Sequence, residues 1–341
     1  MKKRIIFLLV LALVLAGCAV PGAEGKETVY EASFLDLFDT VTVVKGAAES
    51  QEAFRQIAET VQEDLTYYHQ LFDVYNSYEG LNNLKTVNDM AGTGPVQVEQ
   101  PLIDLLTDCR SYYELSGGKV NVAMGGVLKL WHEARSEGLN DPANAKLPDT
   151  AALEAAAEHC SFDAIVIDEE SSTVYITDPL VQLDVGAVAK GWAAQRVAEK
   201  LPANMLLSVG GNVCATGPKT EAGDPWVIGV QDPAGDSYLH TLYVTGGSYV
   251  TSGDYQRAYT VEGKSYHHII DPDTRMPSGY WRSVTVVCAD SGLADALSTA
   301  LFVLPLEEGR KLLEKSGAMA MWVDSQGGIF YSPGFEKIIR T

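Results

Sequence analysis

The sequence predicts an α+β fold, with mixed sheets flanked by helices and arranged as one large domain or two intimate lobes. Two kinds of pattern alternate along the chain: segments with apolar residues at a helical period, and short β-branched runs bounded by turn residues. The 341 residues are 46% hydrophobic and contain no low-complexity run. A chain of this kind buries a substantial core, so disorder is not expected.

The N-terminal half is predicted to form a strand, two helices and a hairpin. Residues 34–44 alternate and are rich in β-branched side chains, which predicts a strand. Residues 49–72 place apolar side chains at helical spacing and predict a long amphipathic helix. A second helix is predicted over 101–115, because Pro101 stands in its first turn and Gly117-Gly118 follow its end. Residues 164–167 and 174–176 predict a hairpin.

The C-terminal half repeats the alternation of strands and helices. Residues 181–185 predict a strand that leads into a helix over 187–201, and 205–209 predict a strand that ends at Gly210-Gly211. The remaining expected elements are strands at 226–231, 239–244 and 284–288, helices at 292–303 and 306–316, and a closing hairpin at 318–323 and 328–331. No linker interrupts the chain after Tyr30 and no internal repeat is evident, so residues 29–341 are expected to form one domain.

The N-terminus has the layout of a lipoprotein export signal. Lys2, Lys3 and Arg4 precede an apolar run, and small residues stand just ahead of Cys18. The run is too short to span a bilayer, which takes about 20 apolar residues. We therefore expect a signal peptide over 1–17, a lipidated Cys18 that anchors the protein in the bilayer, and a tether over 18–28. The protein would then work at the extracytoplasmic face of a bacterial membrane.

The charge and the cysteines exclude several classes of partner and site. Residues 1–17 hold three basic residues and no acidic one, so 22 basic and 45 acidic residues remain, a formal charge of −23. Such a surface repels a polyanion, and no nucleic-acid partner is expected. A phosphate ligand would need local positive charge from a metal, a lysine or helix N-termini. The other cysteines, Cys109, Cys160, Cys214 and Cys288, show no zinc or redox spacing; buried thiols are the first expectation, with oxidation of a pair left open.

The segment LDVGAVAKG, residues 183–191, has features of a phosphate site. A strand is expected to give way to a helix at Gly186, where backbone amides of the first turn could face an anion. Lys190 lies one turn further and could reach the same anion. Asp184 at the strand end could hydrogen-bond a ribityl or ribose hydroxyl or orient the loop. The alternative is an ordinary strand-to-helix turn with a surface lysine.

The segment LADALSTAL, residues 293–301, offers two oxygen ligands. Asp295 and Thr299 are four residues apart, so both project from one face of an otherwise apolar helix. A carboxylate and a hydroxyl suit Mg²⁺ or Ca²⁺, and Mg²⁺ commonly takes few carboxylates while phosphates and waters complete its shell. The alternative is that Asp295 favours the helix dipole and Thr299 bonds back to the carbonyl one turn earlier.

The segment YHHIIDP, residues 266–272, carries two histidines before an apolar pair and an Asp-Pro turn. Alternation in a strand would send His267 and His268 to opposite faces. A histidine with a pKa near the working pH suits a general base for an attacking hydroxyl. The alternative is a structural histidine. Upstream, the loop 251–254 has small residues that would let a flat ring lie against the backbone.

These motifs resemble those of the ApbE family of FAD:protein FMN transferases, from about residue 34 to residue 303. Eight motifs occur in the family order: FDT (38–40), YNSYEGLNNLKTVN (75–88), GGKVNVAMGGVLKLW (117–131), LDVGAVAKG (183–191), LLSVGGNVCATG (206–217), TSGDYQR (251–257), HHIIDP (267–272) and ADALSTA (294–300). Three residues depart from the commonest family pattern: Asn121 stands where aspartate is frequent, Ala123 where threonine is frequent, and Arg275 where glycine is usual.

The resemblance implies an ApbE-like fold and a set of residue roles. Mg²⁺ would be held by the carbonyl of Ala187, the carboxylate of Asp295 and the hydroxyl of Thr299. The residues implied to contact FAD are Phe38, Thr40, Asn121, Asp184, Lys190, His268, Ile269 and Asp271. His268 would be the general base, with Asp271 as its orienter.

The implied reaction transfers FMN from FAD to a threonine hydroxyl of an acceptor protein and releases AMP, so FAD is a substrate. The acceptor implied for this family is an exported subunit of a membrane redox complex. Two alternatives stay open: a Mg²⁺-dependent FAD pyrophosphatase, in which water is the nucleophile, and a non-catalytic flavin-binding lipoprotein. The co-occurrence of Asp295, Thr299, Lys190 and His268 argues against the latter, because binding alone needs neither a base nor a metal.

Overall fold

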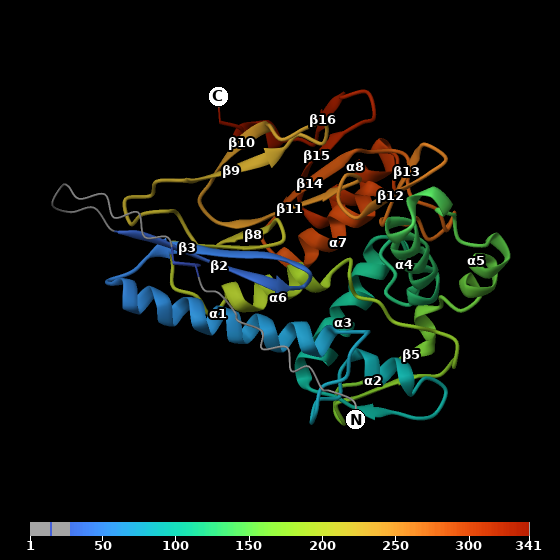
Figure 1. The fold of residues 1–341 in the computed structure, drawn as a ribbon. Helices are drawn as coiled ribbons and strands as arrows, with labels where there is room; N and C mark the ends of the chain where they lie inside the picture. Colours follow the sequence, from blue (N-terminus) through green and yellow to red (C-terminus); the bar gives the residue numbers. More distant parts are fainter. Residues whose placement is uncertain (1–13, 16–27, 341) are drawn as a thin grey trace, which may run out of the picture.

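A large antiparallel sheet is the centre of the molecule (Figure 1). The computed structural model describes residues 14–15 and 28–340. The sheet has nine strands in the order β1-β2-β3-β7-β8-β11-β14-β15-β16. Their bounds are Val14–Leu15, Val29–Leu37, Thr40–Ala47, Met205–Val209, Asn212–Ala215, Gly247–Gly253, Ser283–Cys288, Met319–Val323 and Ile329–Tyr331. All neighbouring strands pair antiparallel, and short hairpins join β2 to β3, β7 to β8 and β15 to β16, while longer segments join the other neighbours.

Three smaller sheets surround the large one. β4 (Val96–Gln97), β6 (Thr173–Ile176) and β5 (Ile165–Asp168) form a three-stranded sheet at one end. β9 (Trp226–Gln231) pairs with β10 (Tyr238–Val244), and β12 (Ala258–Val261) pairs with β13 (Lys264–His267). The β9–β10 pair contributes to a second buried cluster with the far strands of the large sheet, including Met321 and Val323.

Three helices cover one face of the large sheet. α1 (Gln51–Phe72) runs along the β2–β3 hairpin, and α6 (Ala189–Ala198) and α7 (Ser291–Phe302) pack under β8, β11 and β14 (Figure 1). α1 begins where Ser50 accepts a hydrogen bond from the Ala53 N–H at 3.1 Å, and it buries a periodic row that includes Phe54, Val61 and Leu65. The main core therefore lies between these helices and the sheet.

The other helices form the second part of the molecule. α2 (Leu84–Asp89), α3 (Gln100–Leu115), α4 (Gly125–Asn140) and α5 (Thr150–Ala157) gather with the three-stranded sheet at one side, while α8 (Leu306–Ser316) follows α7 (Figure 1). The four elements α2, α4, α5 and the β12–β13 hairpin were not predicted from the sequence. α4 and this hairpin share a small separate core built on Val127, Trp131, Tyr259 and Ile270.

Most of the predicted elements are confirmed, and two are corrected. Residues 34–44 form not one strand but the hairpin β2–β3, whose turn holds Phe38 and Asp39 at φ 53° and 54°. Residues 181–185 are extended but do not form a strand, because their backbone groups do not hydrogen-bond to a neighbouring strand of a sheet. Asn88 donates to the Leu183 carbonyl at 2.9 Å and accepts its N–H at 2.7 Å, and the helix that follows begins at Ala189 instead of 187.

The four cysteines after the tether are free thiols. Cys214 in β8 and Cys288 in β14 both stand opposite Ser248 of the strand between them, so two strand spacings, about 10 Å, separate them. A disulfide needs Cα atoms within about 7 Å, so this pair is not positioned to form one. No helix in the described ranges is long and apolar enough to cross a membrane. Cys18 and most of the predicted signal lie outside the described residues.

Candidate functional site

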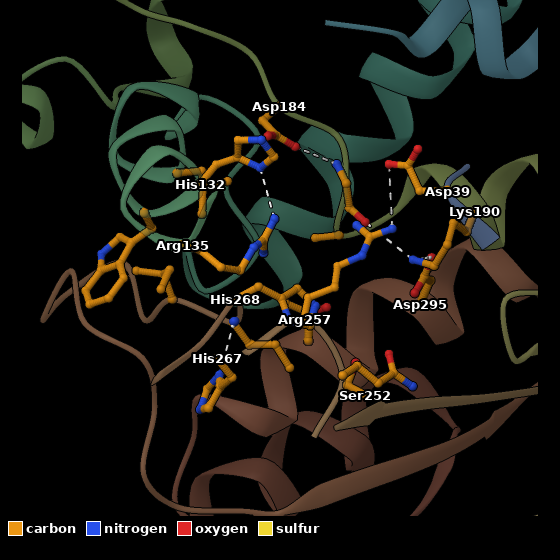
Figure 2. Close-up of a pocket in the computed structure, with 18 of the residues that line it drawn as sticks. Asp39, His132, Arg135, Asp184, Lys190, Ser252, Arg257, His267, His268 and Asp295 are labelled. Carbon is orange, nitrogen blue, oxygen red and sulfur yellow. Dashed lines mark hydrogen bonds and ion pairs between the residues drawn. The ribbon is translucent and has the colours of Figure 1, made fainter. Parts of the chain in front are cut away.

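A cavity of about 420 Å³ lies where α4, α6 and α7 meet the end of the large sheet (Figure 2). Its volume is in the range of small-molecule sites. Nine of the residues predicted for the site line it: Thr40, Asn121, Asp184, Ala187, Lys190, His268, Ile269, Asp295 and Thr299. The structure therefore brings together segments that are more than 250 residues apart in the sequence.

Close packing of α6 on α7 fixes the carboxylate of Asp295. A Cβ atom at Gly191 would stand 2.3 Å from the Ser291 carbonyl oxygen and 2.5 Å from the Asp295 Cβ, so only glycine permits this approach. The Gly191 N–H donates to Asp295 Oδ2 at 2.8 Å. Asp295 is 3% exposed, and this bond together with Lys190, whose Nζ lies 3.5 Å from Oδ2, compensates its buried charge.

Three residues that line the cavity each have an oxygen atom without a hydrogen-bond partner among the described residues. The Gly191 N–H bonds to Asp295 instead of the carbonyl four residues earlier, so the Ala187 carbonyl accepts no hydrogen bond within the described residues. In the same ranges no bond involves Asp295 Oδ1 or the Thr299 hydroxyl, so the expected alternative of a Thr299 back-bond is not formed. All three residues line the cavity.

One carboxylate, one carbonyl and one hydroxyl suit a hard cation. Mg²⁺ accepts oxygen ligands and commonly completes its shell with phosphates and water. The described residues contain no cluster of three or more His, Cys, Asp or Glu that could hold a metal, so a thiolate- or imidazole-rich centre is not formed there. The residues present therefore fit Mg²⁺ better than zinc.

Most of the first-turn backbone amides that were expected to face an anion already have protein partners. Val188 and Ala189 donate their N–H groups to the Val185 carbonyl, Gly186 donates to Asp184 Oδ1 at 2.8 Å, and Gly191 donates to Asp295. Side-chain cations or a metal ion must then supply most of the positive charge for a phosphate. Lys190 is one of them, half-buried at the cavity wall.

Asp184 lies at the top of the cavity beside His132 (Figure 2). Burial raises the pKa of its carboxyl, and the hydrogen bond from the Gly186 N–H opposes that effect. Its own N–H donates to the Val122 carbonyl at 2.8 Å, which ties the turn to the loop before α4. Asp184 thus orients the 184–188 turn and keeps one carboxylate oxygen for a ligand.

The two histidines differ in their surroundings. The His267 Nε2 atom lies 2.8 Å from the Ser278 carbonyl oxygen, and its Nδ1 accepts the Ile269 N–H at 3.2 Å, so its ring is held as a neutral structural element. His268 follows the end of β13 and lines the cavity, and its Nδ1 atom is buried without a hydrogen-bond partner in the described chain. His268 is thus the histidine available for chemistry.

His268 is uncharged in the free protein. Burial lowers its pKa to about 3, and the positive charges of Arg257, Lys190 and Arg135 act in the same direction. The expectation of a pKa near the working pH is therefore wrong for the free protein. The lone pair needed by a general base is present at neutral pH, but the base is weak while these cations are unopposed.

Asp271 does not orient His268. Its carboxylate accepts from Lys119 Nζ at 2.8 Å, and the same ammonium lies 2.7 Å from Asp273. Burial alone would lower the pKa of Lys119, but the two carboxylates outweigh it and the pKa is raised. The ion pairs of Lys119 with Asp271 and Asp273 stabilise the 271–276 turn. Arg275 in this turn has φ 60°, a conformation that favours glycine.

The remaining predicted residues are Phe38, Asn121 and Thr40, and two of them, Asn121 and Thr40, line the cavity. Phe38 does not line the cavity; its N–H donates to His69 Nδ1 at 3.2 Å and its ring packs edge-on against the same imidazole. Asn121 donates to the Cys160 carbonyl and accepts the Ala123 N–H, so its amide serves the loop. Thr40 packs against Gly210, whose added Cβ would lie 2.6 Å from the Thr40 Oγ1.

Sequence reasoning missed two arginines, a tyrosine and a histidine of the site. Arg135 and His132 lie on α4, which was not predicted, and Arg257 was noted only as the last letter of a motif. Tyr75, 59% exposed, lies at the cavity with its ring 5.5 Å from that of His132. The i, i+3 spacing of His132 and Arg135 could have drawn attention to them only once α4 was known.

Comparisons with known proteins identify the family of the chain. The sequence model of the ApbE family matches residues 28–322, and that of a prokaryotic membrane lipoprotein lipid attachment site matches residues 1–19. The FAD:protein FMN transferase of Treponema pallidum (strain Nichols) is 31% identical over 100% of this chain and 98% of its own. The one from Escherichia coli (strain K12) is 25% identical over 97% of this chain and 96% of its own.

Solved structures share the fold. The crystal structure of the ApbE protein of Thermotoga maritima is 30% identical, covers 92% of this chain and 100% of that chain, and superposes with a TM-score of 0.80. The flavin transferase ApbE of Vibrio cholerae, 21% identical, covers the same shares with a TM-score of 0.76 and supports the fold alone.

Proposed function

Because the chain belongs to the ApbE family and is a transferase, we propose that it transfers FMN from FAD to a threonine hydroxyl of an acceptor protein and releases AMP. The observation that carries the proposal is the grouping of three unpaired oxygen donors, a lysine and an uncharged histidine around one cavity. Phosphoryl-group transfer calls for these parts: charge neutralisation at phosphate oxygens and a base for the incoming hydroxyl.

The Ala187 carbonyl, Asp295 and Thr299 would hold Mg²⁺. When bound, the ion would neutralise phosphate oxygens of FAD and the charge that develops on the leaving AMP. The chain's own contribution is to fix the ligand oxygens: Gly191 orients Asp295, and the α6–α7 contact holds both helices in place. Lys190 adds a cation on the same side.

The bond changes balance as follows. The threonine Oγ forms a bond to the phosphorus of the FMN half, and the bond from that phosphorus to the bridging oxygen breaks. AMP leaves with the bonding pair on that oxygen. The hydroxyl proton passes to the neutral ring of His268, which is the only described histidine of the site with an unpartnered buried ring nitrogen.

Two further parts of the proposal concern place and partner. The lipid-attachment match supports a lipid anchor at Cys18, and we place the enzyme at the extracytoplasmic face of the cell membrane, held by acyl chains such as palmitate. The acceptor would be an exported subunit of a membrane redox complex with an exposed threonine. A hydroxyl on a protein chain then competes with water at the same phosphorus.

The test is an incubation of the full-length lipidated protein in detergent micelles with FAD, Mg²⁺ and a threonine-containing acceptor domain. Intact mass of the acceptor should rise by the mass of FMN less water, and EDTA should prevent this. Release of FMN and AMP without modification would identify water as the nucleophile and refute the transferase. Recovery of intact FAD would indicate that the protein binds flavin without catalysing a reaction.

A further inference from the structure

Two arginines face the cavity with little to neutralise them. Arg135 comes from α4, and Arg257 directly precedes β12; Figure 2 shows both beside His268. Among the described residues Arg135 makes no ion pair; its guanidinium contacts His132 Nδ1 at 3.0 Å. Burial and the charge of Arg257 lower the pKa of Arg135, so the two cations are near enough to repel each other.

Among the described residues, the carboxylate that pairs with Arg257 neutralises it poorly. Arg257 lies 3.8 Å from Asp39 Oδ2, and the side chains are 47% and 85% exposed. Exposed pairs of this kind contribute little. Arg257 also donates to the Phe38 carbonyl at 3.3 Å, which places its guanidinium against the β2–β3 turn. The arginines are thus positioned by neutral contacts and keep most of their charge for a ligand.

We propose that Arg135 and Arg257 form a phosphate subsite facing His268, apart from the oxygen donors of Ala187, Asp295 and Thr299. Two features favour an anion there. The two guanidinium groups repel each other and have no close carboxylate partner in the described residues, and the amides of the α6 turn are mostly occupied, so the arginines are needed as further donors for a phosphate. A phosphate oxygen would satisfy guanidinium groups that otherwise repel each other.

A phosphate bound at the subsite would change the pKa of His268, the proposed base. The charged and titratable groups that act on His268 are Arg257, Lys190, His267 and Arg135, while Asp39, Asp184 and Asp295 line the same cavity. A phosphate bound between the arginines would cancel part of the positive field and raise the pKa of His268 above about 3. The histidine then becomes a stronger base when a phosphate donor is present. Arg135 and Arg257 act on the reaction as positioning residues.

The inference rests on the proposed function only for the identity of the phosphate carrier, FAD. Its test uses inorganic pyrophosphate as the probe, with the full-length protein in detergent micelles and EDTA, and measures affinity by calorimetry. Arg135→Gln and Arg257→Gln should each weaken binding about 10- to 100-fold, as expected for a lost charged hydrogen bond. Asp39→Asn should tighten it up to about 5-fold. Arg310→Gln, an exposed arginine on α8, is the matched control and should change nothing. Unchanged affinity in both cavity variants would overturn the proposal.

Binding measurements with AMP, FMN and riboflavin would show which phosphate of FAD occupies the subsite. AMP and FMN carry the two phosphates of FAD, so the half whose binding Arg135→Gln weakens identifies the phosphate that occupies the subsite. Riboflavin, which has no phosphate, should bind the variants and wild type alike. Equal weakening of riboflavin would mean that the arginines contact the flavin ring and would refute the phosphate subsite.

A second readout needs no substitution in the subsite. NMR titration of the His268 ring, assigned with His268→Gln, should show a higher pKa when pyrophosphate is added to wild type. A titration unmoved by saturating pyrophosphate would also count against the subsite. Neither experiment needs an acceptor, so a protein that binds pyrophosphate through these arginines but never modifies an acceptor would refute the transferase and keep the subsite.

Discussion

Replacing Gly191 by alanine would test how closely the α6–α7 contact controls the position of Asp295, one of the proposed Mg²⁺ ligands. The added Cβ would meet the Ser291 carbonyl oxygen at 2.3 Å and the Asp295 Cβ at 2.5 Å, where ordinary contacts begin near 3.4 Å. Neither neighbour can rotate away, because one is backbone and the other is a first side-chain carbon. The helices must therefore separate by about 1 Å, which is the scale of overpacking.

Two opposing contributions set the change in the free energy of unfolding that Gly191→Ala causes. Overpacking of a rigid contact costs about 1–3 kcal/mol. Alanine in a helix returns up to about 1 kcal/mol relative to glycine. We expect a net loss of about 1–2 kcal/mol in the free energy of unfolding and a fall of a few degrees, about 2–5 °C, in Tm. The same movement lengthens the 2.8 Å bond from the Gly191 N–H to Asp295 Oδ2 and displaces the carboxylate.

The assay is thermal unfolding with EDTA and with a series of Mg²⁺ concentrations, paired with calorimetric titration of Mg²⁺. Gly191→Ala should lower Tm and weaken or abolish the Mg²⁺-dependent rise. Gly126→Ala is the control, since it also lies in the first turn of a helix, but its Cβ would meet only the Ala156 Cβ at 3.7 Å. If Gly191→Ala matched Gly126→Ala in both Tm and Mg²⁺ response, the contact would not position the ligands.

Four other outcomes are expected. His268→Ala should lower FMN transfer about 10²- to 10⁴-fold while flavin fluorescence still reports FAD binding; equal loss of both would contradict its role as base. Asp295→Ala should abolish Mg²⁺-dependent turnover, and full activity at limiting Mg²⁺ would reject it as a ligand. Arg275→Gly should stabilise the protein by roughly 0.5 kcal/mol in urea unfolding, because it removes a residue at φ 60°; a loss would show that the side chain packs favourably. Because the folded pKa of His268 is about 3, below its unfolded value of about 6.5, protonation favours unfolding, and its contribution to stability is lost as pH falls through that window. The free energy of unfolding of His268→Gln should therefore decrease less steeply than that of wild type as the pH is lowered. Equal decreases in both proteins would refute the lowered pKa of His268.

The residues proposed to hold Mg²⁺ could be singled out from the sequence because their pattern is local. Asp295 and Thr299 are four residues apart on an apolar helix, and a helix forces both to one side. The reach of Lys190 toward the same point follows from the turn before it. These inferences needed no knowledge of how distant segments meet, and the structure places all three residues at one cavity.

The partners of the histidines and arginines were not predictable, since they depend on tertiary contacts. Asp271 follows His268 closely in sequence, but Lys119, about 150 residues away, takes its carboxylate. Residues 181–185 have the composition of a strand, but the side chain of Asn88 occupies their backbone. α4 begins with two glycines and packs on a small core of its own, so its sequence has no strong helical periodicity. The helix, and with it the position of Arg135, could therefore not be predicted.

The course of β2 sets a limit on how far from the bilayer the enzyme can work. This strand runs nine residues, about 30 Å, from Val29 to the turn of Phe38 and Asp39 at the cavity. The 11 residues 18–28 that would precede it reach at most about 40 Å when fully extended. If Cys18 carries the proposed acyl chains, the cavity would stay within roughly 70 Å of the lipid surface. An acceptor subunit must bring its hydroxyl into that layer, so collisions along the plane of the membrane, and not free diffusion through the surrounding volume, would govern which proteins are modified.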